Sequence, residues 1–398
     1  MPSTLEFRSL NIKGIDMSEK KNVFLTGATG FIGAYLLTEM LKSSHIGKIY
    51  TLCRRFDPQN DRDRILLSFK KFSIEMDRAY LFTDQIQVVE GDITMPRFGL
   101  SDSTYEMICQ EADLIHHVAA RVNHIQPYEL LKKPNVDSMA DAIIMASRGK
   151  QKIVNFVSTL GSAVTRDSIG NYLEDFPDNT ALESDMGYLL SKWEGEKLQA
   201  KFIAEGGKTN LFRLGYISGH STSGVSLFEN NQFMLFVKSC IQLGHAPELD
   251  RTINFTPVDY TVKIMNSPKY TIEGGHVLNL FNFTGLIEWK NVVQWLNARG
   301  YEISIIPFYE WQKLLLSDGE SNPLYRLLPL YGSDNAHEKI LRFGREIHKY
   351  RYDNVCAATI ENDVWPPRLK FELLDTYLSY LQSQEFLPAP TMMESCAA

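Results

Sequence analysis

The sequence predicts an α/β protein in which a doubly wound parallel sheet is followed by a smaller, mostly helical C-terminal domain. Three observations lead to this fold class. Short apolar runs alternate with longer amphipathic stretches from residue 22 onward, which is the pattern of right-handed βαβ units. A glycine-rich turn directly follows the first apolar run. Beyond residue 270 the chain becomes richer in Pro, Tyr and Trp, and its periodicity becomes more helical.

Six short apolar runs are expected to be strands of one sheet. They cover residues 22–26, 48–53, 86–90, 114–117, 152–158 and 209–214. The amphipathic stretches between them, such as 33–42, 62–72 and 188–203, are expected to be helices. Apolar residues at helical spacing between Leu369 and Leu381 predict a final helix that packs on the body.

The composition is that of an ordinary soluble globular protein, with 44% hydrophobic and 22% charged residues. The net charge of -7 argues against general nucleic-acid binding, which needs a basic surface. The five cysteines form no CxxC pair, so we expect reduced thiols and no metal site. The N-terminus lacks the plan of a signal peptide, and no apolar run approaches the roughly 20 residues that cross a bilayer. We expect a monomeric, cytoplasmic protein that binds neither nucleic acid nor membrane.

The glycine-rich turn predicts a Rossmann-type site for a dinucleotide. Gly27 permits a tight turn, Gly30 lets the backbone approach a pyrophosphate, and Gly33 lets the following helix pack close to the strand. The start of that helix offers free N–H groups and a positive dipole end to the phosphates. Three spaced glycines alone are a weak signal, but here they lie between a strand and a helix, as the motif requires. The cofactor contacts expected in and near this turn are Thr26, Gly27, Thr29, Gly30, Phe31, Ile32, Gly33 and Ala119.

The end of the second strand indicates which cofactor is bound. A site for NAD usually has an acidic residue there, which binds the ribose 2′-hydroxyl. This chain has Arg54 and Arg55 instead, and arginines suit the 2′-phosphate of NADPH. Arg64, early in the next helix, is a further candidate, and a solvated surface charge is the alternative for all three. Asp92 and Ile93 follow the third strand and are placed to contact the adenine, although Asp92 is equally suited to cap a turn.

The candidate catalytic residues lie on the fifth strand and on a later helix. Tyr188 and Lys192 are four residues apart, which puts them on one helical face. A nearby ammonium is expected to lower the pKa of the Tyr188 hydroxyl and make it a usable proton donor, and Lys192 is also expected to hold the nicotinamide ribose. Thr159 lies at the edge of the sheet where ligands bind, so its hydroxyl is a candidate for binding an oxyanion, with a simple turn residue as the alternative. We prefer Thr159 to Ser158 because alternation gives them opposite faces, and Ser162 is a weaker substitute.

The turn, the strand-end hydroxyl and the Tyr–Lys pair resemble the extended short-chain dehydrogenase/reductase superfamily. Longer blocks are similar to the thioester reductase domains of nonribosomal peptide synthetases, which also close carboxylic acid reductases and fungal aminoadipate reductases. The resemblance spans residues 22–390. Its main blocks are VFLTGATGFIGAYLL from Val23, GDI from Gly91, PRFGLS from Pro96, VSTL from Val157, SKW from Ser191, RLG from Arg213, ISGH from Ile217, CIQLG from Cys240, PVDY from Pro257 and FLPAP from Phe386.

This resemblance implies a reaction and a partner. In that family a Thr–Tyr–Lys set catalyses the NADPH-dependent reductive release of a thioester from the phosphopantetheine arm of an acyl or peptidyl carrier protein. Thr159, Tyr188 and Lys192 match those three positions, and Arg54 matches the residue that binds the 2′-phosphate. The implied product is an aldehyde, or an alcohol after a second reduction. The adenylation and carrier domains that usually precede this unit are not in the chain, so it resembles a free-standing reductase of natural-product biosynthesis that acts in trans.

The expected domain limits follow from these assignments. Residues 1–20 are expected to be a leader, and 21–270 an NADP(H)-binding Rossmann domain. Residues 271–398, interleaved with parts of 215–250, are expected to bind the substrate and its carrier. One departure from the family pattern, Pro134 in place of a helix-compatible residue, bears on the shape of the pocket.

Three other functions share some of these features. A fatty acyl-CoA reductase has the same fold and the same catalytic set. A sugar-nucleotide epimerase is disfavoured by Arg54, because it needs tightly held NAD. A non-catalytic regulator that binds NADP(H) needs the glycine-rich turn but has no need of Thr159, Tyr188 and Lys192.

A basic segment near the C-terminus is a candidate docking surface. Carrier proteins are usually acidic, so a stripe of positive charge on one helical face is suited to bind one. A solvated helix face is the equally supported alternative. The residues of this basic stripe are Lys339, Arg342, Arg345, His348, Lys349 and Arg351.

Overall fold

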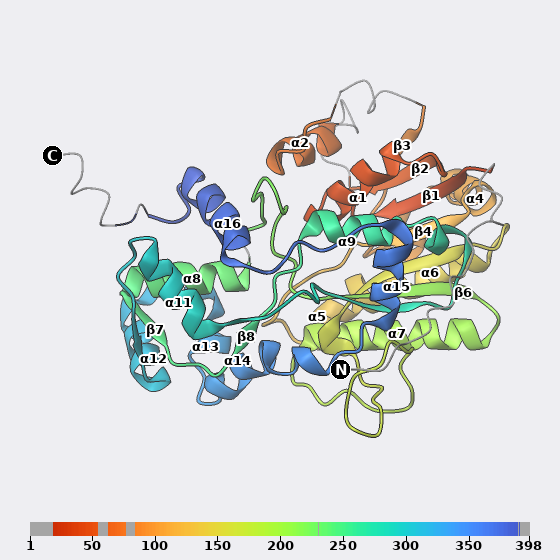
Figure 1. Cartoon of the computed structure of the whole chain (residues 1–398). Coiled ribbons are helices and arrows are strands. Elements are labelled where there is room, and N and C mark those ends of the chain that lie inside the picture. The colour runs from red at the N-terminus through yellow and green to blue at the C-terminus, as the bar shows by residue number, and fades with distance from the viewer. Residues whose placement is uncertain (1–18, 55–62, 77–83, 230, 389, 391–398) are drawn as a thin grey trace.

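The computed structural model describes residues 19–54, 63–76, 84–229, 231–388 and 390. Its main element is a seven-stranded sheet with the order β3-β2-β1-β4-β5-β6-β9, on the right of Figure 1. All neighbouring strands in it are parallel. The strand order reverses between β1 and β4, and ligands of such sheets bind near this point, outside the carboxyl ends of the strands. The doubly wound α/β fold predicted from the sequence is confirmed.

The elements have the following bounds. The strands of the sheet are β1 (Lys21–Thr26), β2 (Ile46–Cys53), β3 (Ile86–Glu90), β4 (Leu114–His117), β5 (Ile153–Thr159), β6 (Lys208–Leu214) and β9 (Val277–Leu280). The helices beside it are α1 (Phe31–Lys42), α2 (Asp63–Lys71), α4 (Asp102–Glu111), α5 (Tyr128–Lys132), α6 (Ser138–Ser147), α7 (Gly187–Ala204), α9 (Val258–Met265), α10 (Lys269–Ile272) and α15 (Asp353–Asn362). The remaining helices are α8 (Gln232–Leu243), α11 (Trp289–Ala298), α12 (Phe308–Asp318), α13 (Leu328–Tyr331), α14 (Ala336–Arg345) and α16 (Phe371–Ser383).

Two apolar layers hold the sheet between helices. One layer joins the sheet to α1, α2, α9 and α15. The other joins it to α4, α6 and α7. Because the strands are covered on both faces, their sequences are continuous apolar runs and do not alternate between apolar and polar residues.

The six predicted strands are all present, and the largest difference at an end is two residues, at the start of β2. The seventh strand, β9, was not predicted. Its four residues, Val277–Leu280, are all buried. The run is short, and it lies in the segment after residue 270 that was assigned to the second domain because of its composition. This strand completes the sheet beside β6 through parallel pairing of Leu214 with Leu280.

A second group of helices, on the left of Figure 1, has an apolar core of its own. Residues from α8, α11, α12, α13 and α16 build this core. Two short strand pairs accompany these helices. One is parallel, between β7 (His245–Pro247) and β11 (Ser304–Ile306), and the other is antiparallel, between β8 (Thr252–Ile253) and β10 (Ile287–Glu288). The chain crosses between the two groups several times, since α8 precedes residue 270 while β9 and α15 follow it and belong with the sheet.

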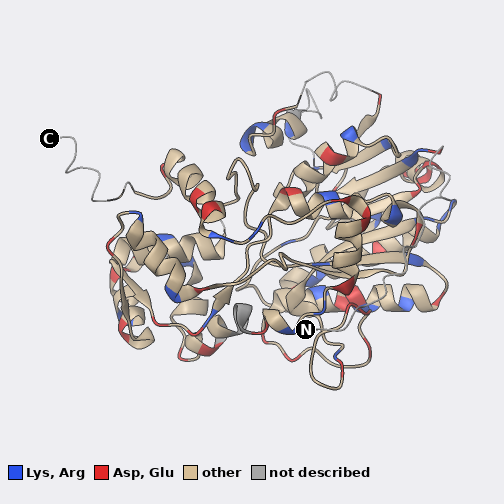
Figure 2. Ribbon diagram, in the orientation of Figure 1, with Lys and Arg blue, Asp and Glu red and all other residues tan. Residues whose placement is uncertain are grey.

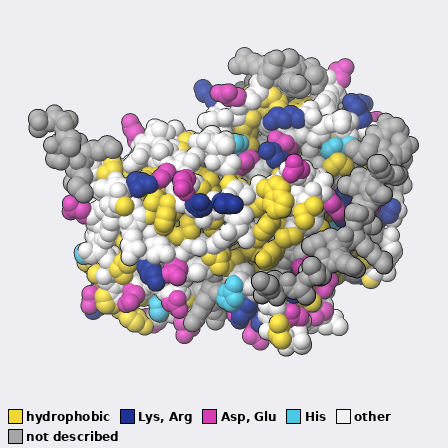
Figure 3. Space-filling model, viewed as in Figure 1, with side chains coloured by type: hydrophobic (Ala, Val, Ile, Leu, Met, Phe, Trp, Pro, Cys, Tyr) yellow, Lys and Arg dark blue, Asp and Glu magenta, His cyan; other side chains and the backbone are white. Residues whose placement is uncertain are grey.

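Charged residues of both signs are interspersed over the two groups of elements (Figure 2). Hydrophobic side chains gather near the middle of the face shown in Figure 3. Within the described residues, no helix is both long enough and apolar enough to cross a membrane.

The basic stripe predicted over residues 339–351 does not lie on one continuous helix. Helix α14 ends at Arg345 and is followed by a short 3-10 turn, Ile347–Lys349. Lys349 pairs with Glu346 at 2.8 Å, and Arg351 pairs with Asp353 at 2.8 Å, so neither charge is unopposed. The side chains of Lys339, Arg342 and Arg345 lie outside the described part of the chain.

Candidate active site

The glycine-rich turn between β1 and α1 has no room for side chains at two of its glycines. Gly27 has a φ of +80°, and a Cβ atom there would lie 2.8 Å from the Ala119 nitrogen. A Cβ atom on Gly33 would lie 2.0 Å from the Gly27 carbonyl oxygen. The turn is closed by the Gly30 amide, which donates to that same carbonyl at 2.9 Å. These close approaches bring the start of α1 directly onto the end of β1.

The first turn of α1 is suited to bind an anion. Gly30 caps the helix without a side-chain hydrogen bond, and the first turn holds no acidic residue. Among the described residues, the amides of Phe31, Ile32 and Gly33 have no partner within the protein. These donors and the positive end of the helix dipole point to the same place, so the residues present fit the pyrophosphate of a dinucleotide.

Thr26 is the first member of a buried polar chain beneath this turn. Its hydroxyl accepts from the Ala119 amide at 3.2 Å and lies 3.1 Å from Nδ1 of His117. The His117 Nε2 lies 3.1 Å from the Ser138 hydroxyl, which donates to the Pro134 carbonyl at 2.7 Å. Since Ser138 uses its proton on Pro134, His117 donates from Nε2 and accepts at Nδ1 from Thr26. Burial lowers the pKa of His117 to about 3, with a smaller effect of Lys192, so the imidazole is neutral.

Arg54 and Arg64 come together at the end of β2. Arg54 is exposed, and the Arg64 guanidinium donates to its carbonyl oxygen at 2.6 Å. Arg55 lies outside the described residues. Asp92 forms a capped turn, since its carboxylate accepts from the amide and the hydroxyl of Thr94, both at 2.8 Å.

Asp92 therefore has the turn-capping role that the sequence left open. Its carboxylate is only partly buried, so this role does not remove it from the neighbourhood of the cofactor. Ile93, beside it, is also partly buried and packs at the edge of the layer that joins the sheet to α4 and α6.

Lys192 joins α7 to β5 at the edge of the sheet. Its ammonium donates to the Val157 carbonyl at 2.7 Å and lies 4.6 Å from the centre of the Phe156 ring. Burial lowers the pKa of Lys192 to about 7, and Glu196 opposes this effect. Val157 lies two residues before Thr159, so this contact places the face of α7 that carries Tyr188 next to the strand end.

The pKa of Tyr188 is raised, whereas the sequence predicted that it would be lowered. Burial raises the pKa of Tyr188 above its ordinary value, and the expected lowering by Lys192 is wrong for this arrangement. The Lys192 ammonium is directed to the Val157 carbonyl, and desolvation of the phenolate dominates. The Tyr188 ring packs edge-on against His124, with 5.5 Å between ring centres. Tyr188 therefore keeps its proton, as a hydrogen-bond donor must.

The hydroxyls near the end of β5 divide into two groups. Ser158 donates to Glu196 at 2.6 Å, and Ser162 donates to the Thr159 carbonyl at 2.6 Å, so both serines are used by buried partners. The Thr159 side chain is partly buried, and its hydroxyl has no partner among the described residues. The opposite faces expected for Ser158 and Thr159 explain this difference, and Thr159 remains the candidate for binding substrate.

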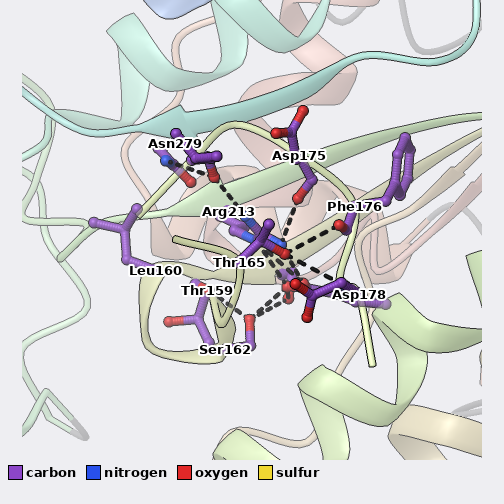
Figure 4. A network of polar contacts seen from close by, with 12 residues as sticks. Thr159, Leu160, Ser162, Thr165, Asp175, Phe176, Asp178, Arg213 and Asn279 are labelled. Carbon is purple, nitrogen blue, oxygen red and sulfur yellow. Dashed lines mark hydrogen bonds and ion pairs between the residues drawn. The ribbon is translucent and has the colours of Figure 1, made fainter. Parts of the chain in front are cut away.

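A buried ion pair underlies this strand end (Figure 4). Figure 4 labels Arg213 within this polar network. The side chains of Arg213 on β6 and Glu196 on α7 are both fully buried and meet at 2.8 Å. Arg213 also donates to the carbonyls of Leu173 and Asp175, at 3.1 and 3.0 Å. The pair thus ties together β6, α7, the loop after β5 and, through Ser158, the end of β5 itself.

Asn135 holds the start of α7 from the other side. It lies in a π-helical turn, Lys133–Asp137, and its amide nitrogen donates to the Ser191 hydroxyl at 2.9 Å and to the Arg121 carbonyl at 3.1 Å. Ser191 in turn donates to the Tyr188 carbonyl at 2.8 Å. Sequence reasoning gave roles to neither Asn135 nor Glu196, because their partners lie 56 and 17 residues away and no local spacing relates them.

A comparison with models of known protein families shows the family to which the chain belongs. The family model NAD_binding_4, described as male sterility protein, matches residues 25–265, more than half of the chain. The chain belongs to this family. The cofactor class predicted from the glycine-rich turn, a nicotinamide dinucleotide, is thereby confirmed for this member of the male sterility protein family.

Curated relatives of this male sterility family member include two fungal enzymes and a synthetase. The L-2-aminoadipate reductase large subunit of Eremothecium gossypii is 29% identical over 395 residues, covering 92% of this chain and 28% of the relative. That of Penicillium chrysogenum is 29% identical, covering 94% of this chain and 28% of the relative. The nonribosomal peptide synthetase asaC of Aspergillus flavus is 30% identical, covering 77% of this chain and 31% of the relative. The chain spans less than a third of the length of these relatives.

Solved structures show the same architecture. The terminal R domain from the myxalamid PKS-NRPS biosynthetic pathway has a TM-score of 0.81 and 28% identity, and the match covers 94% of this chain and 93% of that one. The reductase domain of a nonribosomal peptide synthetase from Mycobacterium tuberculosis has a TM-score of 0.72 and 23% identity, covering 93% of each chain. A UDP-glucuronic acid 4-epimerase from Bacillus cereus, at 13% identity and a TM-score of 0.58, shares the fold alone.

Replacement of Gly33 by Ala should disrupt the turn. The new Cβ atom would meet the Gly27 carbonyl at 2.0 Å, and backbone must move to relieve the contact. We expect Gly33→Ala to lower NADPH affinity by at least about 10-fold, or about 1.4 kcal/mol, in fluorescence titrations. Gly285→Ala is the control, because its Cβ atom would meet only Leu369 at 3.7 Å. Wild-type affinity in Gly33→Ala would show that the turn tolerates a side chain.

Replacement of Glu196 by Gln should destabilise the fold, because Arg213 would remain buried without its charge partner. Breaking such a pair typically costs about 3–5 kcal/mol, which urea unfolding at pH 7 measures. The matched control is Glu194→Gln on the same helix, where the partly exposed pair with Lys197 at 3.3 Å contributes little. Equal stability losses in the two variants would contradict a supporting role of the buried pair.

Proposed function

We propose that this protein is an NADPH-dependent reductase that releases an acyl or peptidyl thioester from the phosphopantetheine arm of a carrier protein as an aldehyde. The observation that carries the proposal is the contact between Lys192 and the Val157 carbonyl at 2.7 Å. It joins the helix face of Tyr188 and Lys192 to the strand that ends at Thr159. In this proposal all three residues act at the edge of the sheet that also carries the glycine-rich turn.

Thr159 and Tyr188 are the proposed donors to the thioester carbonyl. The Thr159 hydroxyl has no partner among the described residues, and the raised pKa of Tyr188 keeps its hydroxyl protonated. Two donors aimed at one oxygen stabilise the negative charge that develops on it during reduction. Tyr188 is also placed to deliver its proton as the general acid.

Lys192 is proposed to bind the nicotinamide ribose, while its contact with the Val157 carbonyl holds α7 against β5. Burial lowers the pKa of Lys192 to about 7, and Glu196 opposes this effect. The glycine-rich turn binds the pyrophosphate, and Arg54, supported by Arg64 through its carbonyl, binds the 2′-phosphate. Asp92 and Ile93 border the adenine.

NADPH, when bound at this site, supplies a hydride to the thioester carbonyl carbon. The carbon–sulfur bond then breaks, the thiol of the arm leaves with a proton, and an aldehyde remains. One thioester, one NADPH and one proton thus give one aldehyde, one thiol and NADP⁺. Whether a second NADPH carries the aldehyde on to an alcohol is decided by product analysis.

The relatives support this reaction and this partner. The aminoadipate reductases and the reductase domain from Mycobacterium tuberculosis carry the word reductase in their names. The structure of a thiolation-reductase di-domain from an archaeal non-ribosomal peptide synthetase matches 92% of this chain, at 22% identity. Because an acyl-CoA reductase would use the same catalytic set, the activity assay compares carrier-bound and CoA thioesters of the same acyl group. Faster reduction of the carrier-bound thioester supports the proposal.

Removal of the Tyr188 hydroxyl should slow the reaction. We expect Tyr188→Phe to lower kcat by about 100-fold or more, the usual contribution of a general acid or an oxyanion donor, with little change in NADPH affinity. The measurement is NADPH oxidation with a carrier-bound acyl thioester. Tyr301→Phe, which removes a buried hydroxyl bonded to the Pro388 carbonyl at 2.9 Å, is the control for loss of stability. Unchanged turnover of Tyr188→Phe would remove Tyr188 from the mechanism.

Replacement of Arg54 should weaken the selection of NADPH over NADH. Loss of a charged hydrogen bond to the 2′-phosphate costs about 1.5–3 kcal/mol, so Arg54→Ala should raise the Kd for NADPH by at least about 10-fold. NADH affinity should change much less, because NADH has no 2′-phosphate. Arg148→Ala, which removes an exposed arginine paired with Glu106 at 2.7 Å, controls for the change in net charge. A parallel loss of affinity for both cofactors would rule out the assignment.

A further inference from the structure

We infer that Arg251 forms a subsite for an anionic oxygen group of the bound thioester, either a carboxylate on its acyl chain or the phosphate of its arm. This inference rests on the proposed function and adds a substrate class to it. The evidence is a partly buried guanidinium that lacks a counter-charge, at the edge of the sheet where substrate must lie.

Arg251 has no anionic partner in the described part of the chain. Its Nε atom is buried and makes no hydrogen bond. Its neighbours Glu248 and Asp250 are both exposed, and among the described residues neither forms an ion pair with it. Burial lowers the pKa of Arg251, and the groups that oppose this effect are the hydroxyls of Tyr331 and Tyr216, not carboxylates.

The surroundings of Arg251 make an unpaired charge costly. The Tyr216 ring packs on Phe233 and Phe255, with ring centres 5.7 and 5.8 Å apart, and Tyr331 stacks on Phe236 at 5.6 Å. A buried cation without a hydrogen-bonded anion destabilises the folded protein. A charged group placed at such a cost is a candidate for a functional site. Arg251 as a whole remains partly accessible, as a ligand-binding guanidinium requires.

Tyr331 adds a second donor. Its hydroxyl accepts from the Gln232 side chain at 3.0 Å, and its own proton has no acceptor among the described residues. Burial raises the pKa of Tyr331 to about 12, so this proton stays in place near neutral pH. In contrast, the Tyr216 hydroxyl donates to Asn231, which also caps α8. Arg251 and Tyr331 together offer the charge and the hydroxyl that a carboxylate or phosphate binds.

The position of this subsite is fixed by the sheet. Thr159 is the register partner of Leu214 across β5 and β6, and Tyr216 follows Leu214 by two residues, or about 7 Å of extended chain. The chain returns to this point after Arg251, since the Thr256 amide donates to the Tyr216 carbonyl at 2.9 Å. The strand β8, directly after Arg251, lies against α14. Arg251 therefore lies on the side of the second group of helices, and its guanidinium is close enough to the Tyr331 and Tyr216 hydroxyls to interact with them electrostatically.

The test compares four thioesters that differ in one charged group at a time. Hexanoyl and adipoyl thioesters have the same number of carbons, but only adipoyl ends in a carboxylate. Each is prepared on pantetheine and on 4′-phosphopantetheine. The enzymes are wild type, Arg251→Met, Arg251→Lys as the variant that keeps the charge, and Arg148→Met as the control on a distant exposed arginine. The readout is kcat/KM from NADPH oxidation.

If Arg251 binds an acyl carboxylate, the wild-type enzyme prefers adipoyl over hexanoyl, and Arg251→Met reduces that ratio by about 10-fold or more. If it binds the phosphate of the arm, Arg251→Met reduces the preference for phosphopantetheine over pantetheine with both acyl groups. Arg251→Lys retains part of either preference, and Arg148→Met retains all of it. Ratios unaffected by Arg251→Met would overturn the inference.

Two further measurements separate this inference from a structural role and from the proposed function. A structural arginine would lower the melting temperature when replaced, as we expect for Arg213→Met, whereas Arg251→Met should leave it unchanged or raise it. Calorimetric titration with the adipoyl and hexanoyl amides of pantetheine and phosphopantetheine reports binding without turnover. Binding that depends on Arg251, in an enzyme that reduces no thioester, would refute the proposed function and leave the anion subsite standing. Binding of the charged amides that is equal in wild type and Arg251→Met would refute the subsite.

Discussion

The buried pair of Glu196 and Arg213 is the interaction on which the arrangement of the site depends. It is formed where α7, β6 and the loop after β5 meet, and Ser158 joins it from the strand that ends at Thr159. Two opposite charges without solvent are stable only when nearly all their hydrogen bonds are made, and Arg213 completes its set with two backbone carbonyls. The pair therefore fixes the relative positions of the elements that carry the candidate catalytic residues, although neither charge contacts a substrate itself.

The same helix face carries groups with opposite tasks. Glu196 is satisfied entirely by the protein, whereas Lys192, one turn earlier, is buried with a backbone carbonyl and an aromatic ring as its nearest described partners. Tyr188, another turn earlier, is held protonated by burial. Along α7, Glu196 is thus bonded within the protein, whereas Lys192 and Tyr188 are candidates for binding a ligand. Two arginines show a similar contrast. Arg213 is bonded to Glu196 and to two carbonyls, whereas Arg251 has no anionic partner among the described residues.

The sequence was sufficient to predict most of the sheet. Strands covered on both faces are continuous apolar runs, and all six that were predicted are present. The strand β9 was not predicted because a run of four buried residues is too short to show a recognisable periodicity. Within the site, the glycines could be read from their spacing, since steric contact at Gly33 depends on neighbours in the chain. The raised pKa of Tyr188 could not be predicted from the sequence, because desolvation depends on which side chains pack around the residue in the fold. The same holds for Asn135 and Glu196, whose partners come together only through the fold.

The segment that follows α14 returns to the site from far along the sequence. Tyr350 donates to the Leu160 carbonyl at 2.9 Å and stacks on Tyr172 at 4.5 Å, and backbone hydrogen bonds join Tyr172 to residues on both sides of Tyr350. Leu160 is the residue directly after Thr159. The helices of the second group are thus fastened to the backbone beside the candidate oxyanion donor. A rotation of α14 relative to the sheet would therefore strain the hydrogen bond between Tyr350 and the Leu160 carbonyl, directly beside Thr159.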